Sequence, residues 1–187
     1  MEQDEKMIES MNLYKKGTSG NIEDGFCIKE KMYYFKKEEF FQSHIQVMLP
    51  EVFVDLPEDI RRMKYPNEQR PPIIKSNLEE GMDFTFNILD YPKEFRTIDK
   101  VSQFMKNVLK TMNPAFQFYE EKVERLGDME MAWFDFKSFG LDGNMYNIYY
   151  FIHLNNKFLH GIYNCYEKDR DNWKTVAQTV MHSIKIC

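Results

Sequence analysis

Two histidines, His153 and His160, have the spacing in this sequence that best suits metal chemistry. They flank Asn155-Asn156, a dipeptide typical of a two-residue turn between antiparallel strands. In that hairpin both imidazoles lie diagonally on one sheet face, with their backbones roughly 7–8 Å apart. A catalytic zinc needs a third protein ligand, and the pattern places no carboxylate or thiol beside them. We interpret them as sheet histidines with hydrogen-bond partners, and the alternative is a small hydrolase or metal-assisted enzyme.

A second candidate is the segment MKYPNEQRPPIIKSN (63–77), which carries three prolines between a helical and a strand pattern. Its candidate binding residues are Lys64, Glu68, Arg70 and Lys75. A phosphate cradle needs backbone N–H groups from a glycine-rich loop, which prolines do not supply. We interpret the segment as a stiff structural corner that Glu68 or Arg70 ties to the body. The alternative is a partner-binding corner, because rigid loops are good recognition surfaces.

The remaining nucleophiles and carboxylates form no catalytic set in the sequence. Ser138 and Ser183 have no nearby base, and there is no G-x-S-x-G elbow. Asp135 and Lys137 share one face of a predicted strand and can pair with each other. We therefore expect no catalytic residues and no cofactor.

The composition argues against several classes of protein. The chain has 187 residues, of which 43% are hydrophobic and 16% aromatic, so it should fold around a core. A net charge of −5 without a Lys/Arg-rich run argues against general nucleic-acid binding. The acidic start and the short apolar runs predict neither a secretory signal nor a membrane span. Three widely spaced cysteines (Cys27, Cys165 and Cys187) favour reduced thiols and a cytoplasmic location.

The periodicity of apolar residues predicts more strands than helices. The expected strands are 26–28, 32–35, 44–49, 72–77, 83–90, 116–126, 129–139, 144–154 and 157–166. The expected helices are 56–64, 97–114 and 169–186. Asp55 and Glu58 have the spacing of a capping box at the start of the first helix.

This order of elements predicts the fold class. Hairpin-length links dominate, so we expect an α+β fold with a mostly antiparallel sheet of about six strands sandwiched between helices. The 144–166 hairpin has large apolar groups on both faces, which favours a central position. A possible amphipathic helix, carrying Met7, Ile8, Met11 and Tyr14, precedes these elements. We divide the chain into an N-terminal arm and extension at 1–38 and an α+β domain at 39–187.

Several phrases of the sequence resemble one fold family. They are HIQVMLPEVFVDLP, YPNEQRPPIIKSN, FDFKS, YNIYYF, LHGIYNC and WKTVAQTVMHSI, spread over residues 40 to 186. In their order they are similar to the PsbP-like fold, which is shared by the PsbP extrinsic subunit of photosystem II, a Ran-binding nuclear import factor and DcrB-type bacterial proteins. The resemblance implies an antiparallel sheet between helices, a bacterial member of the fold, binding of other macromolecules, and no shared catalytic residue.

These observations together favour a non-enzymatic, cytoplasmic protein-binding module whose partner is a protein. A toxin-neutralising protein of the immunity type is a further hypothesis, suggested by the small size, the acidity and the lack of a signal. Fold alone does not decide among these functions.

Overall fold

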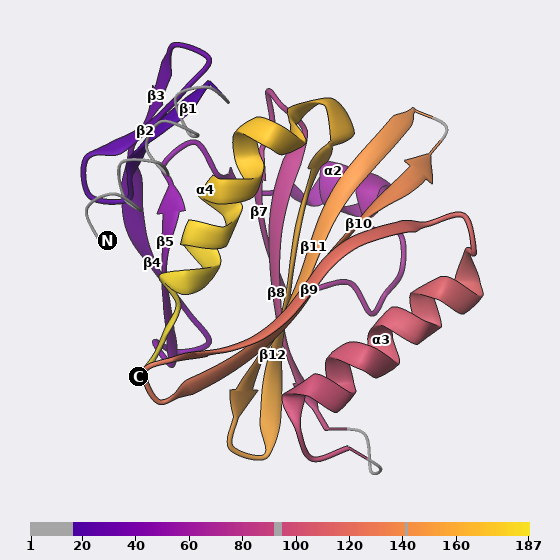
Figure 1. Ribbon diagram of the computed structural model, residues 1–187. Coiled ribbons are helices and arrows are strands. Elements are labelled where there is room, and N and C mark those ends of the chain that lie inside the picture. The colour runs from indigo at the N-terminus through magenta and orange to yellow at the C-terminus, as the bar shows by residue number, and fades with distance from the viewer. Residues whose placement is uncertain (1–16, 92–94, 141) are drawn as a thin grey trace, which may run out of the picture. The chain divides into compact units, whose positions relative to one another are not determined.

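The structure is a computed structural model and describes residues 17–91, 95–140 and 142–187. Figure 1 shows the chain coloured by residue number from its N-terminus to its C-terminus. The chain divides into two compact units. One comprises the chain up to Val52 together with Lys168–Cys187, and the other is the continuous segment Phe53–Glu167. The predicted amphipathic arm lies outside the described residues. All the candidate binding and metal residues named above belong to the second unit.

The second unit is built on a seven-stranded sheet with the order β6-β7-β8-β12-β11-β10-β9. The strands are β6 (Val54–Asp55), β7 (Ile73–Asn77), β8 (Met82–Asp90), β9 (Gln117–Leu126), β10 (Met129–Gly140), β11 (Gly143–Leu154) and β12 (Lys157–Tyr166). Neighbouring strands are antiparallel throughout. The predicted α+β class with a mostly antiparallel sheet is confirmed. About six strands were predicted, and the sheet has seven, because the two-residue strand β6 adds one at an edge.

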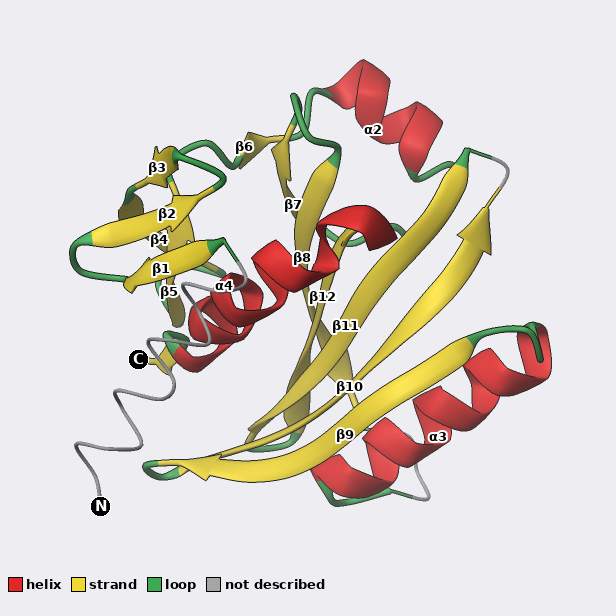
Figure 2. Ribbon diagram, turned by 45° about the horizontal axis from the view of Figure 1, so that its top comes forward, coloured by secondary structure: helices red, strands yellow, loops and turns green. Residues whose placement is uncertain are grey.

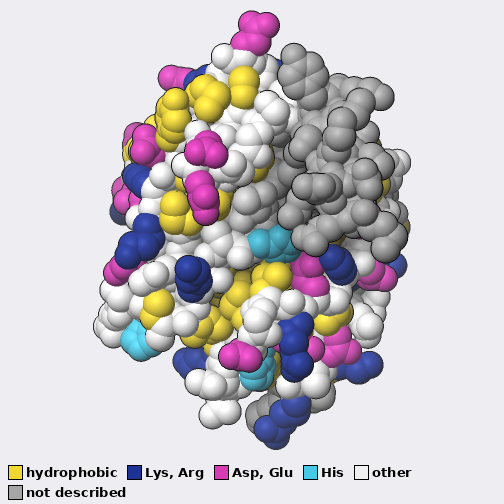
Figure 3. Space-filling view, turned by 60° about the vertical axis from the view of Figure 1, so that its left-hand side comes forward, with side chains coloured by type: hydrophobic (Ala, Val, Ile, Leu, Met, Phe, Trp, Pro, Cys, Tyr) yellow, Lys and Arg dark blue, Asp and Glu magenta, His cyan; other side chains and the backbone are white. Residues whose placement is uncertain are grey.

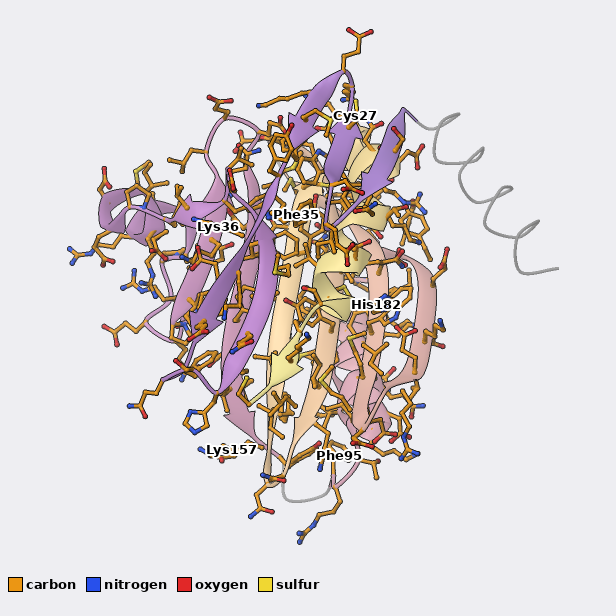
Figure 4. The ribbon with its side chains drawn as sticks, turned by 90° about the vertical axis from the view of Figure 1, so that its left-hand side faces the viewer. Cys27, Phe35, Lys36, Phe95, Lys157 and His182 are labelled. Atoms are coloured by element: carbon orange, nitrogen blue, oxygen red, sulfur yellow. The ribbon has the colours of Figure 1, made fainter. Side chains whose placement is uncertain are left out.

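The hairpin of β11 and β12 lies at the centre of this sheet, as its two apolar faces predicted. Leu154 is paired with Lys157 and His153 with Phe158, which is the predicted register. The Asn155-Asn156 turn was expected to need positive φ at both positions, but of the two only Asn155 has it, with a φ of 50°. Lys157, which is labelled in Figure 4, begins β12 directly after the turn.

Gly161 on β12 is required by the side chain that lies across it. Its partner in the register is Tyr150 on β11, and a Cβ at position 161 would stand 2.0 Å from a carbon of the Tyr150 ring. Tyr150 is fully buried, and burial raises the pKa of its hydroxyl. Any larger residue at position 161 must therefore displace a core aromatic ring.

Helix α3 (Ile98–Met112) covers one face of the sheet. Thr97 precedes it in an extended conformation, and the chain leaves the helix at Asn113, just before Pro114. Its buried apolar side chains join one core cluster with residues of β10, β11 and β12: Ile98, Val101, Leu109, Ala132, Phe134, Phe136, Phe151 and Phe158. Within this unit α3 therefore provides the helical layer on one face. The last predicted helix belongs to the other unit, so a sheet sandwiched between helices is not evident within this unit.

A bulge interrupts the pairing of β9 with β10 at Asp135. Tyr119 and Glu120 of β9 both stand opposite this one residue. The Glu120 backbone N–H donates to Asp135 Oδ1 at 2.7 Å, and the Tyr146 hydroxyl donates to Oδ2 at 2.6 Å. Asp135 is fully buried, so its carboxylate supplies acceptors where the bulge disturbs the ladder.

The first unit contains two three-stranded sheets. One has the order β1 (Thr18–Asn21), β2 (Gly25–Ile28), β3 (Lys31–Tyr33), and the other β13 (Lys185–Ile186), β5 (Ile45–Pro50), β4 (Phe35–Phe40). The 3-10 turn η1 (Glu167–Asp169) leads into helix α4 (Arg170–His182). The predicted boundary between residues 38 and 39 falls inside β4, and it stays a prediction as a domain boundary.

Contacts between distant parts of the chain hold the first unit together. The Trp173 ring of α4 packs edge-on against Tyr33 of β3 at 4.9 Å between centroids. The Met48 backbone N–H of β5 donates to Ser183 Oγ at 3.0 Å. His182 ends α4 and is exposed (Figure 4). In the view of Figure 3, basic and acidic side chains of the described residues are interspersed, in keeping with the small net charge.

Candidate functional site

Helix α2 (Glu58–Lys64) opens the proline-rich corner, and its charges follow the helix dipole. Glu58 and Asp59 lie in the first turn, and the basic residues lie in the last. The Tyr65 backbone N–H donates to the Arg61 carbonyl at 2.9 Å, and Pro66 follows. The helix therefore ends where the proline predicts that it should.

The predicted capping box at the start of α2 is wrong. Pro57 is the N-cap residue, and it offers no side-chain hydrogen bond. Asp55 lies on β6 and forms an ion pair with Lys75 of β7, at 3.0 Å between Oδ1 and Nζ. The sequence has the spacing of a capping box, but Asp55 pairs with β7 at the sheet edge and so does not cap the helix.

Arg61 fastens the corner to α2. Its Nη2 atom donates to the Pro71 carbonyl at 2.7 Å and to the Pro72 carbonyl at 3.1 Å. These carbonyls belong to the two prolines that lead the chain into β7. One guanidinium therefore fixes the end of the loop against the helix, which makes the corner rigid.

A second attachment joins the end of α2 to the sheet at Asp83. The Tyr65 hydroxyl donates to Asp83 Oδ2 at 2.7 Å, and Lys64 Nζ approaches the same oxygen at 2.6 Å. Burial, and next the negative charge of Asp83, raise the pKa of Tyr65. The hydroxyl therefore stays protonated and acts as a donor, and the Asp83 carboxylate, fully buried, is held by a cation.

The outward side of α2 is apolar and basic. None of the helix's residues is buried. Met63 is 83% exposed and Ile60 is 38% exposed, and the exposed Arg62 forms a surface pair with Glu58. We call residues 58–73 the α2 platform: a short helix and loop, fixed by Arg61 and Asp83, that present these side chains to solvent.

The four binding residues predicted from the sequence have different partners and degrees of exposure. Lys64 is paired with Asp83, and Lys75 with Asp55. Arg70 is half-buried, and its backbone N–H donates to the Asn67 carbonyl at 3.2 Å. Glu68 is exposed. The attachments of the corner that sequence reasoning missed are Arg61, Tyr65 and Asp83. The only signal for them was that Arg61 and Tyr65 flank the predicted helix end.

The two candidate metal histidines have separate environments. His153 Nδ1 lies 2.6 Å from the Tyr91 hydroxyl. His160 stacks on the Phe151 ring at 4.9 Å between centroids, with 4° between the planes. Burial lowers the pKa of His160 to about 4. In the described residues no group of three or more His, Cys, Asp or Glu side chains is placed to hold a metal ion.

Two further properties concern membrane-spanning helices and disulfides. None of the helices in the described ranges is long and apolar enough to cross a bilayer. In the described residues, Cys27, Cys165 and Cys187 form no disulfide.

The comparisons with known proteins identify the fold. No protein-family model and no curated protein matches the chain. The cyanobacterial PsbP protein CyanoP from Synechocystis sp. PCC 6803 superposes with a TM-score of 0.62 and 10% identity, over 82% of this chain and 92% of that one. LpqN, involved in cell envelope biogenesis of Mycobacterium tuberculosis, gives a TM-score of 0.56 and 13% identity, over 84% and 93%. A protein from Bacteroides thetaiotaomicron VPI-5482 gives a TM-score of 0.52 and 9% identity, over 81% and 48%.

An antiparallel sheet with a long helix on one face places the chain in the α+β class. Within that class it has the PsbP-like fold, as the sequence resemblance predicted. At these identities the likeness concerns the fold alone, and function has to be argued from the residues.

Proposed function

We propose that the protein is a non-enzymatic protein-binding module that contacts its partner through the α2 platform. One observation carries the proposal: α2 buries none of its residues, yet it is fixed by charged hydrogen bonds. A helix that contributes nothing to a core is retained at an entropic cost. Binding to a second molecule is a role that offsets this cost.

The exposed side chains of the platform indicate the chemistry of the partner. Met63 is the most exposed of the large hydrophobic residues in the described part of the chain, and methionine adapts well to apolar binding surfaces. Arg62 beside it and Glu68 in the loop would form a charged rim. The partner that fits is a protein with an apolar depression bordered by an acidic group opposite Arg62 and a basic group opposite Glu68. Of the predicted binding residues, Glu68 and Arg70 lie in the platform, and Lys64 would attach it to the sheet through Asp83. Lys75 lies outside it, paired with Asp55.

The proposed compartment is the cytoplasm. The lack of a disulfide among the described cysteines supports it, because oxidising compartments favour disulfides. The PsbP-like fold is compatible with a binding role but does not specify one.

Affinity capture with a matched control tests this function. The immobilised full chain should capture a partner from a native lysate, and Met63→Gln should weaken that capture about tenfold or more. Met112 is 75% exposed in the last turn of α3, so Met112→Gln is the control and should capture normally. Both variants should melt like the parent protein. Equal capture by both would exclude the α2 platform, and reproducible substrate turnover without a captured partner would favour an enzyme.

A further inference from the structure

Strand β9 forms an open edge of the seven-stranded sheet. It is the last strand in the sheet order, and among the described residues no strand pairs with its outer side (Figure 2). A strand edge of this kind can pair with another strand through its outward backbone groups. Val123 in this strand is 52% exposed, and Glu121 and Arg125 on the same face are also exposed. The edge is therefore accessible to a second chain.

Charges along β9 distinguish what can pair with this edge. If two copies of β9 pair antiparallel about a twofold axis, the residue on the axis faces its own copy. Centring the pairing on Glu120, Glu121, Lys122, Glu124 or Arg125 would place two like charges directly opposite each other, which is destabilising. Only the centre at Val123 avoids this conflict in the central part of the strand.

The register centred on Val123 is also attractive. It places the two valines opposite each other, Glu121 opposite Arg125 of the second copy, and Lys122 opposite Glu124 of the second copy. By symmetry each of these opposite-charge pairs occurs twice. Within one chain Lys122 Nζ already lies 2.8 Å from Glu124 Oε2, so the arrangement would extend an existing ion pair into a network.

We propose that β9 pairs antiparallel with β9 of a second copy of this chain, centred on Val123, so that the two sheets become continuous. The bulge at Asp135 disturbs β9 at Tyr119 and Glu120, which limits the regular pairing to residues 121–125. A contact this short gives a weak dimer that depends on protein concentration. This interface is separate from the α2 platform and does not rest on it.

Charge reversal tests both the interface and its register. Sedimentation equilibrium of the full chain up to millimolar concentration should show a monomer–dimer equilibrium. Glu121→Arg or Arg125→Glu alone should weaken the dimer at least tenfold, because each creates two like-charge pairs. The double variant should restore the dimer. Both side chains are exposed, so melting temperatures should change little, although Glu121 also pairs with Lys106 at 2.7 Å. A monomeric parent protein, or a double variant as weak as the single ones, would overturn the proposal.

Cysteine cross-linking gives an independent reading of the register. In a background with Cys27→Ser and Cys187→Ser, Val123→Cys places two thiols across the axis. Cα atoms directly opposite in antiparallel strands are about 4.5–5.5 Å apart, a separation that a disulfide spans. Mild oxidation should therefore cross-link Val123→Cys. Tyr119→Cys on the same strand does not face itself and should remain uncrosslinked. Equal cross-linking of the two variants would contradict the Val123 centre.

Discussion

Replacing Arg61 by alanine should destabilise the protein because it detaches the proline-rich corner from α2. The substitution removes the donors to the Pro71 and Pro72 carbonyls, at 2.7 and 3.1 Å. A hydrogen bond to a charged group contributes about 1.5–3 kcal/mol. Since one nitrogen makes both bonds and the second is exposed, we expect a total loss of about 2–3 kcal/mol. For a chain of this length, the melting temperature should then fall by about 4–12 °C.

Arg62→Ala is the matched control for this prediction. Arg62 is the next residue in the same helix, and its pair with Glu58 is solvent-exposed at 71% and 56%. An exposed i,i+4 pair contributes little to stability because solvent screens it, so the control should melt within about 2 °C of the parent protein. Thermal melts followed by circular dichroism, with urea titrations at one temperature, measure both variants. If Arg61→Ala shifts the melt no more than Arg62→Ala does, the guanidinium does not hold the corner.

Three further predictions concern the second unit. His160 has a pKa of about 4 in the fold against 6.5 for an unperturbed histidine, so the unfolded chain binds a proton first as the pH falls. Stability should therefore be lost between about pH 6.5 and 4, by roughly 3 kcal/mol at most. Urea titrations across this range should show a smaller loss for His160→Phe than for the parent protein. An identical loss in both would contradict the assignment of this pH dependence to His160. Asp135→Ala should cost about 2–4 kcal/mol in urea unfolding because it removes the acceptor of two donors, and adding Tyr146→Phe should recover part of that cost; a change under about 1 kcal/mol would refute it. Gly161→Ala should cost about 1–3 kcal/mol by displacing the Tyr150 ring, and a variant as stable as the parent would show that the ring can move freely.

Elements with strong local patterns were predictable from the sequence. The register of the central hairpin followed from Asn155-Asn156 together with strict alternation on both sides, because a two-residue turn leaves one pairing possible. The start and end of α3 followed from an apolar stripe and a proline. β6 was missed because a strand of two residues has no periodicity, and its pairing with β7 depends on the chain around it.

The contacts that attach the α2 platform could not be predicted from the sequence, for a different reason. Arg61 binds backbone carbonyls. Because every residue has a backbone carbonyl, no residue type in the sequence indicates which one Arg61 will bind. Asp83 begins a strand, and whether it faces α2 depends on which side of the sheet the helix crosses. Local patterns thus predicted that the corner is there, while the partners that hold it come from tertiary packing.

The division of the first unit between the two ends of the chain affects the order of folding during synthesis. β5 pairs with β13, and its Met48 amide binds Ser183, but these partners are synthesised only after the whole of Phe53–Glu167. The segment Phe53–Glu167 is continuous and can form its sheet earlier. Strand β5 is therefore made before that segment and can pair with β4 at once, but it gains β13 and the Ser183 contact only after the segment has been made. Ribosome-bound chains that stop at residue 167 and carry a flexible linker long enough to clear the exit tunnel should protect the second unit from protease. They should leave β5 more open to cleavage than chains that continue through residue 187, which should protect both units.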